Sequence, residues 1–325
     1  MRSWIVTAGL MMVPTLALAD APALEKGTAK FRHVGDQAAV PQRYRLDEHT
    51  FAWELEPKLE LESTGVRVFH VRFPSPVVSP TPENNTVHAE FYRPKGAGPF
   101  PGVIVLDVTG GDQQLSRLIS THLANKGVAA LFVQMAYYGP RRPAGSDLRM
   151  LSADVPRTFA ALTQTVLDVR RASAWLENRP DVDPKHLGII GTSLGSFVAA
   201  LAAESEPRLG KAAVMLGGGG FVEGYYDDPR AAPVRKVWEA LGGTRERMKE
   251  LLAPYDPLTC AANLKDRKLL IIAAKRDDIV PPSCAERLWE ATGKQKIVWY
   301  NCTHYGAALY MIPALGHITT HFRGE

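Results

Sequence analysis

A serine flanked by small residues stands between an apolar run and a segment that can form a helix. Residues 191–195 read G-T-S-L-G, and the apolar run at 187–190 precedes them. Glycines two positions on either side allow a serine to occupy a sharp strand-to-helix turn that raises its hydroxyl above a sheet. A glycine-rich packing turn is the alternative, but the position between a strand and a helix favours Ser193 as a nucleophile.

An aspartate and a histidine follow two later strand-like runs. Asp277 comes after the apolar run at 269–274, and His304 comes after the run at 297–300. A serine hydroxyl is a weak nucleophile unless a base takes its proton, and that base must be oriented by an acid. Because the acid and the base of such a site lie at the carboxyl ends of later strands, we expect Asp277 and His304 to complete a catalytic triad with Ser193.

The oxyanion that forms during acyl transfer needs hydrogen-bond donors. The backbone N–H of Leu194 follows the nucleophile at a helix N-terminus, and we expect it to be one donor. The second is expected from residues 109–111, which read T-G-G after the apolar run at 102–108, and Thr109 is the residue that we select. An ordinary strand-to-helix turn is the alternative for this stretch.

A segment rich in tyrosine and arginine follows the fourth strand-like run, at the same end of the sheet as the serine. Residues 136–142 read A-Y-Y-G-P-R-R. Tyr137 and Tyr138 are candidates for lining a substrate pocket, and Arg141 is a candidate for meeting an anionic substrate. A solvated loop explains the same composition equally well.

The elements that must position these residues alternate between strands and helices. Runs at 66–73 and 87–93 have period-two alternation, which is typical of half-exposed strands and predicts an antiparallel edge. The later strand-like runs are continuously apolar, as in parallel strands covered by helices on both faces. These later runs are at 102–108, 128–135, 187–190, 212–216, 269–274 and 297–300. The sequence therefore predicts an α/β fold, a three-layer sandwich with a mostly parallel eight-stranded sheet.

Two regions interrupt that alternation. Residues 20–65 are polar and weakly periodic, so we expect an N-terminal extension packed on a core domain at 66–325. Residues 221–257 break the alternation and contain a helix-like stretch, which predicts a small lid-like insertion.

The first nineteen residues are typical of a cleaved secretory signal. Arg2 supplies a positive charge, an uncharged and mostly apolar stretch follows, and A-L-A precedes Asp20. Gly9 and Pro14 interrupt the stretch, which argues against a stable membrane anchor. We therefore expect the mature chain in the periplasm or outside the cell.

Composition and cysteine usage limit the function further. The chain has 325 residues, 46% of them hydrophobic, and a net charge of +4 without a run of five basic residues, so nucleic-acid binding has little support. The mature chain keeps three cysteines with no C-x-x-C spacing, and neither a zinc site nor a disulfide framework is indicated. Cys260 and Cys284 are the one pair that we consider for a bridge, and three buried thiols are the alternative.

These motifs together resemble the α/β-hydrolase superfamily, and within it the dienelactone-hydrolase and acetyl-xylan-esterase-like branches. The resemblance spans about residues 87–310. Residues 168–176 and 181–183 are also similar to a segment of prolyl-oligopeptidase-like enzymes, residues 277–281 match the D-x-x-V-P acid loop, and residues 304–306 match the histidine loop. Asp107-Val108 replaces the usual His-Gly before the oxyanion loop, and Ser193 replaces the cysteine of dienelactone hydrolases.

The D-x-x-V-P pattern selects between two adjacent carboxylates. Asp277 stands four residues before Pro281, as the acid of that pattern does. Because neighbouring side chains at a strand end diverge, Asp278 is expected to turn toward solvent or toward the start of the next helix.

The resemblance implies a serine hydrolase that needs no cofactor or metal. A carboxylesterase acting on small or carbohydrate-linked esters is the leading interpretation. A prolyl-oligopeptidase-like peptidase and an acyl thioesterase are the alternatives, and a binding protein without catalytic activity is a fourth. The sequence does not indicate the oligomeric state.

Overall fold

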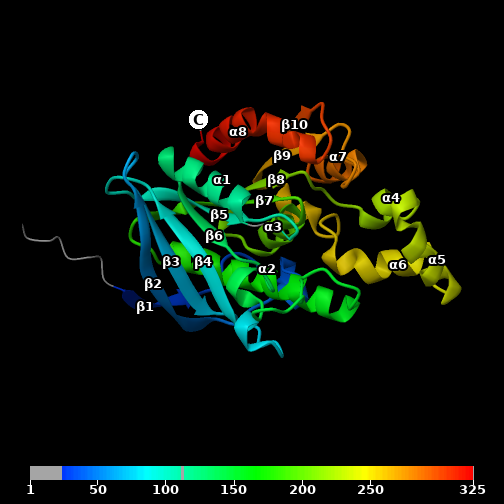
Figure 1. The fold of residues 1–325 in the computed structure, drawn as a ribbon, viewed down its shortest axis with the longest axis horizontal. Coiled ribbons are helices and arrows are strands. Elements are labelled where there is room, and N and C mark those ends of the chain that lie inside the picture. Colours follow the sequence, from blue (N-terminus) through cyan, green and yellow to red (C-terminus); the bar gives the residue numbers. More distant parts are fainter. Residues whose placement is uncertain (1–23, 111–112, 325) are drawn as a thin grey trace, which may run out of the picture.

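A computed structural model of the protein describes residues 24–110 and 113–324. Its strands form one ten-stranded sheet in the order β1-β2-β3-β4-β6-β5-β7-β8-β9-β10 (Figure 1). The strands are β1 (Glu25–Phe31), β2 (His49–Leu61), β3 (Val66–Pro74), β4 (Thr86–Arg93), β5 (Phe100–Leu106), β6 (Ala129–Val133), β7 (Val182–Thr192), β8 (Leu209–Met215), β9 (Lys268–Ala274) and β10 (Lys296–Tyr300).

Pairing within the sheet changes direction once. Strands β1 to β4 pair antiparallel, and β4 also pairs antiparallel with β6. From β6 to β10 every pair is parallel. The expected antiparallel edge followed by parallel strands is therefore confirmed.

The sheet has ten strands where the sequence predicted eight, because the segment before residue 66 contributes β1 and β2. Along the 13 residues of β2 only Phe51 and Leu55 are buried. Because so few positions of β2 are buried, the apolar alternation that identifies a strand is weak there.

Helices cover both faces of the sheet (Figure 1). Side chains of α1 and α8 pack into the apolar core on one face, and side chains of α2, α3 and α7 pack into the core on the other face. The bounds of these helices are α1 (Gln114–Asn125), α2 (Val155–Glu177), α3 (Leu194–Ser205), α7 (Pro282–Ala291) and α8 (Met311–Arg323). The three-layer sandwich is thus present, with one core on each side of the sheet.

Strand β5 shows why the central strands read as continuous apolar runs. Val103 and Val105 belong to the core under α1 and α8, whereas Ile104 and Leu106 belong to the opposite core. Since successive side chains of a strand point to opposite faces, a strand that is covered on both faces must be apolar at every position.

The segment between β8 and β9 extends away from the sheet, at the right of Figure 1, and contains α4 (Phe221–Tyr225), α5 (Ala232–Ala240) and α6 (Arg245–Leu252). Asp256 fastens it at its base, because its carboxylate accepts the backbone N–H groups of Gly220 at 2.8 Å and Phe221 at 2.7 Å. The lid-like role expected for residues 221–257 stays a prediction.

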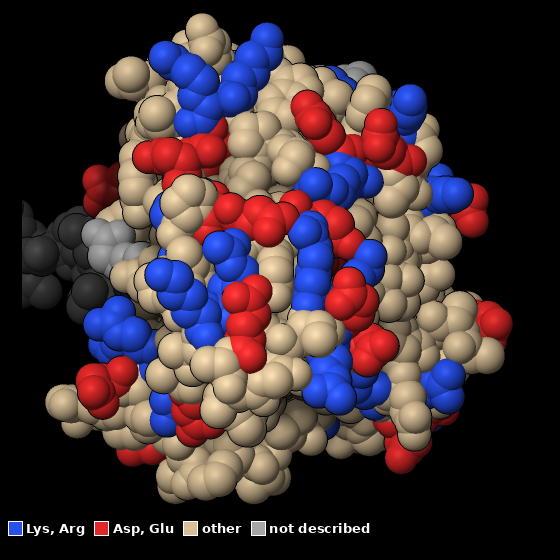
Figure 2. Space-filling model, turned by 90° about the vertical axis from the view of Figure 1, so that its right-hand side faces the viewer, with Lys and Arg blue, Asp and Glu red and all other residues tan. Residues whose placement is uncertain are grey.

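Other expectations concern the termini, the thiols and the surface. The expected signal segment, residues 1–19, lies outside the described residues. Within residues 24–110 and 113–324, no helix has the length and apolar character needed to cross a membrane. Cys260, Cys284 and Cys302 are free thiols, and burial raises the pKa of Cys284 to about 12. On the face that Figure 2 shows, acidic and basic side chains are interspersed.

Candidate active site

Ser193 occupies the turn between β7, which ends at Thr192, and α3, which begins at Leu194. Its backbone has φ of 51° and ψ of −117°, in a region that L-residues rarely adopt. A Cβ at Gly191 would overlap the Gly195 carbonyl, and one at Gly195 would overlap the Asp107 carbonyl. The two glycines are therefore required by close backbone approach.

The structure brings the three residues of the expected triad into one chain of hydrogen bonds. His304 Nε2 lies 3.1 Å from Ser193 Oγ. His304 Nδ1 lies 2.8 Å from Asp277 Oδ2 and 3.0 Å from Oδ1. With the ring proton on Nδ1 donated to Asp277, the lone pair of Nε2 is left to accept the serine proton.

Asp277 is held in place by its own loop. Its Oδ1 accepts the backbone N–H of Val280 at 2.7 Å and that of Ile279 at 2.9 Å, and its side chain is 3% exposed. An acid fixed by backbone donors and shielded from water keeps the imidazole in one orientation.

Asp278 has a contact that the sequence did not predict. The residue is exposed, as expected for a carboxylate that turns toward solvent. Its Oδ1 also accepts the backbone N–H of His304 at 3.2 Å. The two adjacent carboxylates therefore divide their contacts, since Asp277 orients the ring of His304 and Asp278 supports its backbone.

Both residues expected to supply oxyanion donors lie beside Ser193. Leu194 is the first residue of α3, and N–H groups in the first turn of a helix have no partner within that helix. Thr109 is exposed and lines the same cavity as Ser193. The next residue, Gly110, donates its N–H to the Tyr138 hydroxyl at 3.0 Å, so a hydrogen bond to the loop after β6 holds the residues next to Thr109.

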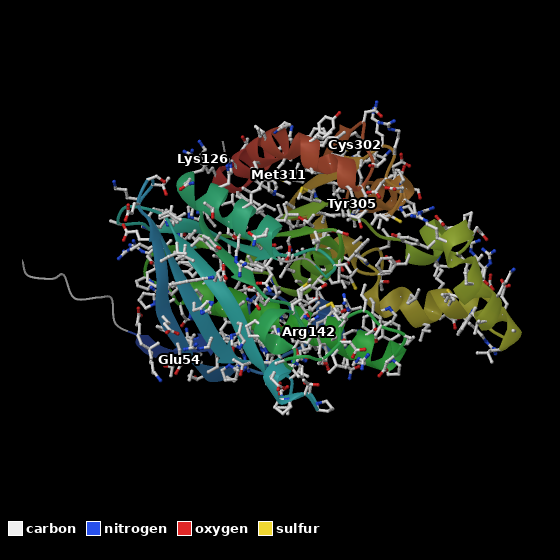
Figure 3. All side chains as sticks on the ribbon, viewed as in Figure 1. Glu54, Lys126, Arg142, Cys302, Tyr305 and Met311 are labelled. Carbon is white, nitrogen blue, oxygen red and sulfur yellow. The ribbon has the colours of Figure 1, made fainter. Side chains whose placement is uncertain are left out.

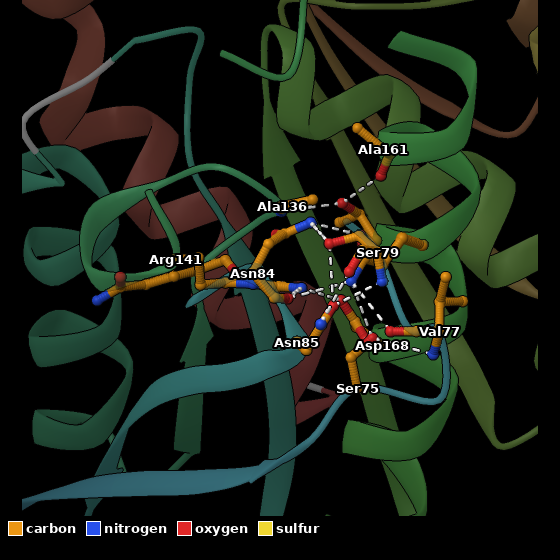
Figure 4. A network of polar contacts seen from close by, with 12 residues as sticks. Ser75, Val77, Ser79, Asn84, Asn85, Ala136, Arg141, Ala161 and Asp168 are labelled. Carbon is orange, nitrogen blue, oxygen red and sulfur yellow. Dashed lines mark hydrogen bonds and ion pairs between the residues drawn. The ribbon is translucent and has the colours of Figure 1, made fainter. Parts of the chain in front are cut away.

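The prediction that Arg141 meets a substrate is wrong. Its side chain is fully buried and forms an ion pair with Asp168 of α2, with Nη2 at 2.8 Å from Oδ2. The guanidinium also donates to the carbonyl oxygens of Gln134 at 3.0 Å and Asn84 at 2.8 Å (Figure 4). Sequence reasoning missed this because Asp168 is 27 positions further along the chain, on a different element.

The two tyrosines of that segment also lie away from the cavity. Tyr137 and Tyr138 are 6% and 8% exposed and belong to the apolar core under α2 and α3. Tyr137 has a positive φ of 64°, and its N–H donates to Asn84 Oδ1 at 3.1 Å. Neither is among the residues that line the cavity, so their role in a substrate pocket is corrected to the support of nearby loops.

The cavity beside the triad has a volume of about 540 Å³. Tyr305, in the short turn before α8, and Met311, the first residue of α8, line it and are labelled in Figure 3. Its lining comes from the carboxyl-terminal parts of several strands, from the first turns of helices and from the loops between them: Val108, Thr109, Leu115, Thr192, Ser193, Met215, Leu216, Ile272, Ile279, Tyr300, His304, Tyr305, Ala307, Ala308, Met311 and Ala314. No local sequence signal joins residues from so many elements, so most of them were not predicted.

The described residues contain no cluster of three or more His, Cys, Asp or Glu side chains arranged to hold a metal ion. The donor groups at the candidate site are a hydroxyl, an imidazole and a carboxylate that already contact one another.

Comparisons with known proteins give the class. The model of the family described as alpha/beta hydrolase domain containing 18 matches residues 46–216, more than half of the chain. The model of the prolyl oligopeptidase family matches residues 160–307. The chain belongs to the alpha/beta hydrolase domain containing 18 family, within the α/β-hydrolase superfamily.

Individual relatives and solved structures are similar to the chain. An uncharacterized protein of Mycobacterium tuberculosis is 25% identical over 243 residues, which cover 74% of this chain and 71% of that protein. Acyl-coenzyme A thioesterase 1 of Rattus norvegicus is 30% identical over 253 residues, which cover 73% of this chain and 56% of the rat protein. The crystal structure of an acetyl xylan esterase from Paenibacillus sp. R4 has a TM-score of 0.64 at 18% identity, over 83% of this chain and 88% of that chain.

Proposed function

We propose that the protein is a serine hydrolase that cleaves ester bonds through an acyl-enzyme on Ser193. The observation that carries the proposal is the chain of hydrogen bonds from Ser193 Oγ to His304 Nε2 and from His304 Nδ1 to Asp277. A nucleophile, a base and an orienting acid in this order make up the machinery of acyl transfer.

In the first half of the reaction, Ser193 Oγ attacks the carbonyl carbon of the ester while His304 Nε2 takes the hydroxyl proton. Asp277 stabilises the imidazolium that results, and the N–H groups of Leu194 and Thr109 donate to the oxyanion. The imidazolium then gives its proton to the departing alcohol. In the second half, His304 activates water, which releases the acid and restores the serine.

The substrate class is a carboxylic ester, small or carbohydrate-linked. Support comes from the fold, which matches that of an acetyl xylan esterase. The rat thioesterase relative favours thioesters as the second candidate. The prolyl oligopeptidase match covers residues 160–307, which contain all three triad residues, and favours peptides as the third. A binding protein without activity is disfavoured because Ser193, His304 and Asp277 are all in bonding distance.

We also propose that the chain is exported, on the basis of residues 1–19. Intact mass of the mature protein tests this, since cleavage after the A-L-A sequence leaves Asp20 as the first residue. A mature chain that keeps residues 1–19 would contradict export by this route.

A fluorophosphonate probe together with a substrate panel tests the activity. The wild type should be labelled and should hydrolyse p-nitrophenyl esters faster than matched thioesters or peptide anilides. Ser193→Ala should lose both labelling and turnover. A wild type that is not labelled and cleaves no ester would refute the proposed function.

A further inference from the structure

The cavity beside the triad has a mostly apolar lining. Its exposed lining residues, which form its rim, are Thr109, Ile279, Tyr305 and Ala308, whereas Ser193 and His304 are 8% and 7% exposed. In the remaining lining the side chains are aliphatic or methionine apart from Thr192 and Tyr300, and none of the lining residues is Lys, Arg, Asp or Glu. A substrate group that enters beyond the rim therefore meets mostly hydrocarbon, and the buried hydroxyls of Thr192 and Tyr300, which have no hydrogen-bond partner among the described residues, are the polar exceptions.

The apolar part of the cavity extends into the core of the molecule. Its most buried lining residues, Ile272 of β9 and Ala314 of α8, are 2% and 3% exposed and belong to the core between the sheet and α1 and α8. Leu115 of α1 and Met311 of α8 line it and pack against the same core. The cavity is thus a gap between two helices and the sheet, with Ser193 and His304 in its lining.

We propose that this cavity receives the acyl part of the substrate, and that the acyl part is an uncharged hydrocarbon chain longer than acetyl. The inference rests on the proposed function and adds a specificity to it. A volume of about 540 Å³ lies within the range of about 300–1,000 Å³ typical of pockets for drug-sized ligands, and an acetyl group leaves most of it empty.

The sign of the preference follows from burial. Each methylene removed from water gains about 0.8 kcal/mol, equivalent to about a fourfold increase in binding, whereas a charged or unpaired polar group buried in this lining carries a large desolvation cost. A hydrocarbon chain is therefore the group that this cavity stabilises.

The order of the two half-reactions indicates which part of the ester lies inside. The alcohol must leave before water attacks the acyl-enzyme, so it needs an open route, and the exposed side chains of Thr109 and Tyr305 are at the open rim. The acyl group stays attached to Ser193 through both half-reactions. A largely apolar cavity that is lined by Ser193 therefore fits the acyl chain.

Two ester series separate these alternatives. In p-nitrophenyl acetate, butyrate, hexanoate and octanoate the acyl chain grows, and kcat/KM of the wild type should rise about threefold to fourfold for each methylene until the cavity is full. In methyl, butyl and hexyl acetate the alcohol grows, and kcat/KM should change much less. A flat or falling acyl series, or a larger gain in the alcohol series, overturns the inference.

Two substitutions fill the cavity from opposite walls, and each has a matched control. Met311→Trp and Leu115→Trp should lower the octanoate-to-acetate ratio of kcat/KM by about tenfold or more, the loss of about two buried methylenes. Their neighbours Ile312 and Leu118 are 85% and 48% exposed and do not line the cavity, so Ile312→Trp and Leu118→Trp should leave the ratio unchanged. An unchanged ratio in the folded cavity variants refutes the assignment.

A binding measurement separates this inference from the proposed function and does not depend on the folding of the tryptophan variants. Octanamide resembles the ester but is not cleaved by Ser193→Ala. Calorimetry on Ser193→Ala should show octanamide binding more tightly than butyramide, by about threefold to fourfold per methylene. Equal affinities overturn the inference about the cavity even if esters are hydrolysed. Octanamide binding by a protein that cleaves no ester would leave the cavity assignment standing and refute only the hydrolase.

Discussion

Two of the buried polar networks among the described residues differ in where they end. One joins Asp277, His304 and Ser193 and terminates at the hydroxyl that faces the cavity. The other joins Arg141 to Asp168, and its further members close on one another inside the protein (Figure 4). Both contain a carboxylate next to a nitrogen-containing side chain, so residue type alone does not distinguish them. The network with an end at a cavity is the one that can transfer a proton to a substrate.

The network of Arg141 and Asp168, here called the closed network, has a structural role instead. Asp168 Oδ1 accepts the Ser75 hydroxyl at 2.6 Å, and Gln164 Oε1 accepts the Asn84 amide at 2.6 Å. Together with the Arg141–Asp168 ion pair, these contacts join α2 to the chain between β3 and β4 and to the loop after β6. None of these residues lines the cavity, so the network stabilises this part of the fold without contacting the reacting atoms.

The network of Asp277, His304 and Ser193, here called the open network, ends at the Ser193 hydroxyl. Removal of that hydroxyl should have the largest effect. Ser193→Ala should lower kcat for p-nitrophenyl esters by about 10⁶-fold, the order of magnitude lost when a triad serine is removed. Its unfolding free energy should stay within about 0.5 kcal/mol, because alanine and serine share the same backbone restriction at φ of 51°. Steady-state kinetics and urea unfolding measure both quantities. Full retention of activity would contradict the assignment.

The buried end of the open network is its acid, Asp277. Asp277→Asn should lower kcat by about 10³- to 10⁴-fold, since an amide cannot stabilise the imidazolium of His304. Asp278→Asn is the matched control and should cost less than about tenfold, because its amide oxygen still accepts the His304 N–H. Steady-state kinetics of both variants with the same ester substrate measures the two kcat values. The reverse ranking would move the triad acid to Asp278.

The closed network should respond in stability. Arg141→Met leaves the buried Asp168 carboxylate without its cation and should lower the unfolding free energy by about 3–5 kcal/mol. The double variant Arg141→Met with Asp168→Leu should recover much of that loss, because no unpaired charge remains. Urea unfolding of the single and double variants measures this. A single variant as stable as the wild type would show that the ion pair is dispensable.

The smallest effect is expected at Tyr138, whose hydroxyl accepts the Gly110 N–H. Tyr138→Phe removes the acceptor of the Gly110 N–H and should lower kcat by about threefold to tenfold, on the order of one hydrogen bond. Because this tyrosine positions the oxyanion loop and does not contact substrate, KM and the unfolding free energy should change little. Tyr137→Phe leaves the Gly110 contact in place and is the control. An equal loss in both variants would indicate a general loosening of the loop.

Local patterns in the sequence predicted that Ser193, His304 and Asp277 lie together, and the structure places them within hydrogen-bond distance. Ser193 directly follows β7, and Asp277 and His304 lie in the loops that begin after β9 and β10, so strand boundaries were enough to place the three residues at one edge of the sheet. Arg141 was misplaced because its position depends on Asp168, and a distant ion pair leaves no periodic signal in the sequence. The lining of the cavity and the strands β1 and β2 escaped prediction for related reasons, since one depends on tertiary packing and the other is half in water.

The fastening at Asp256 closes the helical segment between β8 and β9 into a loop. Asp256 lies at the end of the segment, and its carboxylate accepts the N–H groups of Gly220 and Phe221 at the beginning, so the two ends emerge side by side from the domain. The segment also reaches the loop of the triad acid, because the Tyr225 hydroxyl of α4 donates to the Ile279 carbonyl at 3.0 Å and the Ile279 N–H is bound by Asp277. A replacement of these helices must therefore keep this contact if the catalytic framework is to stay unchanged.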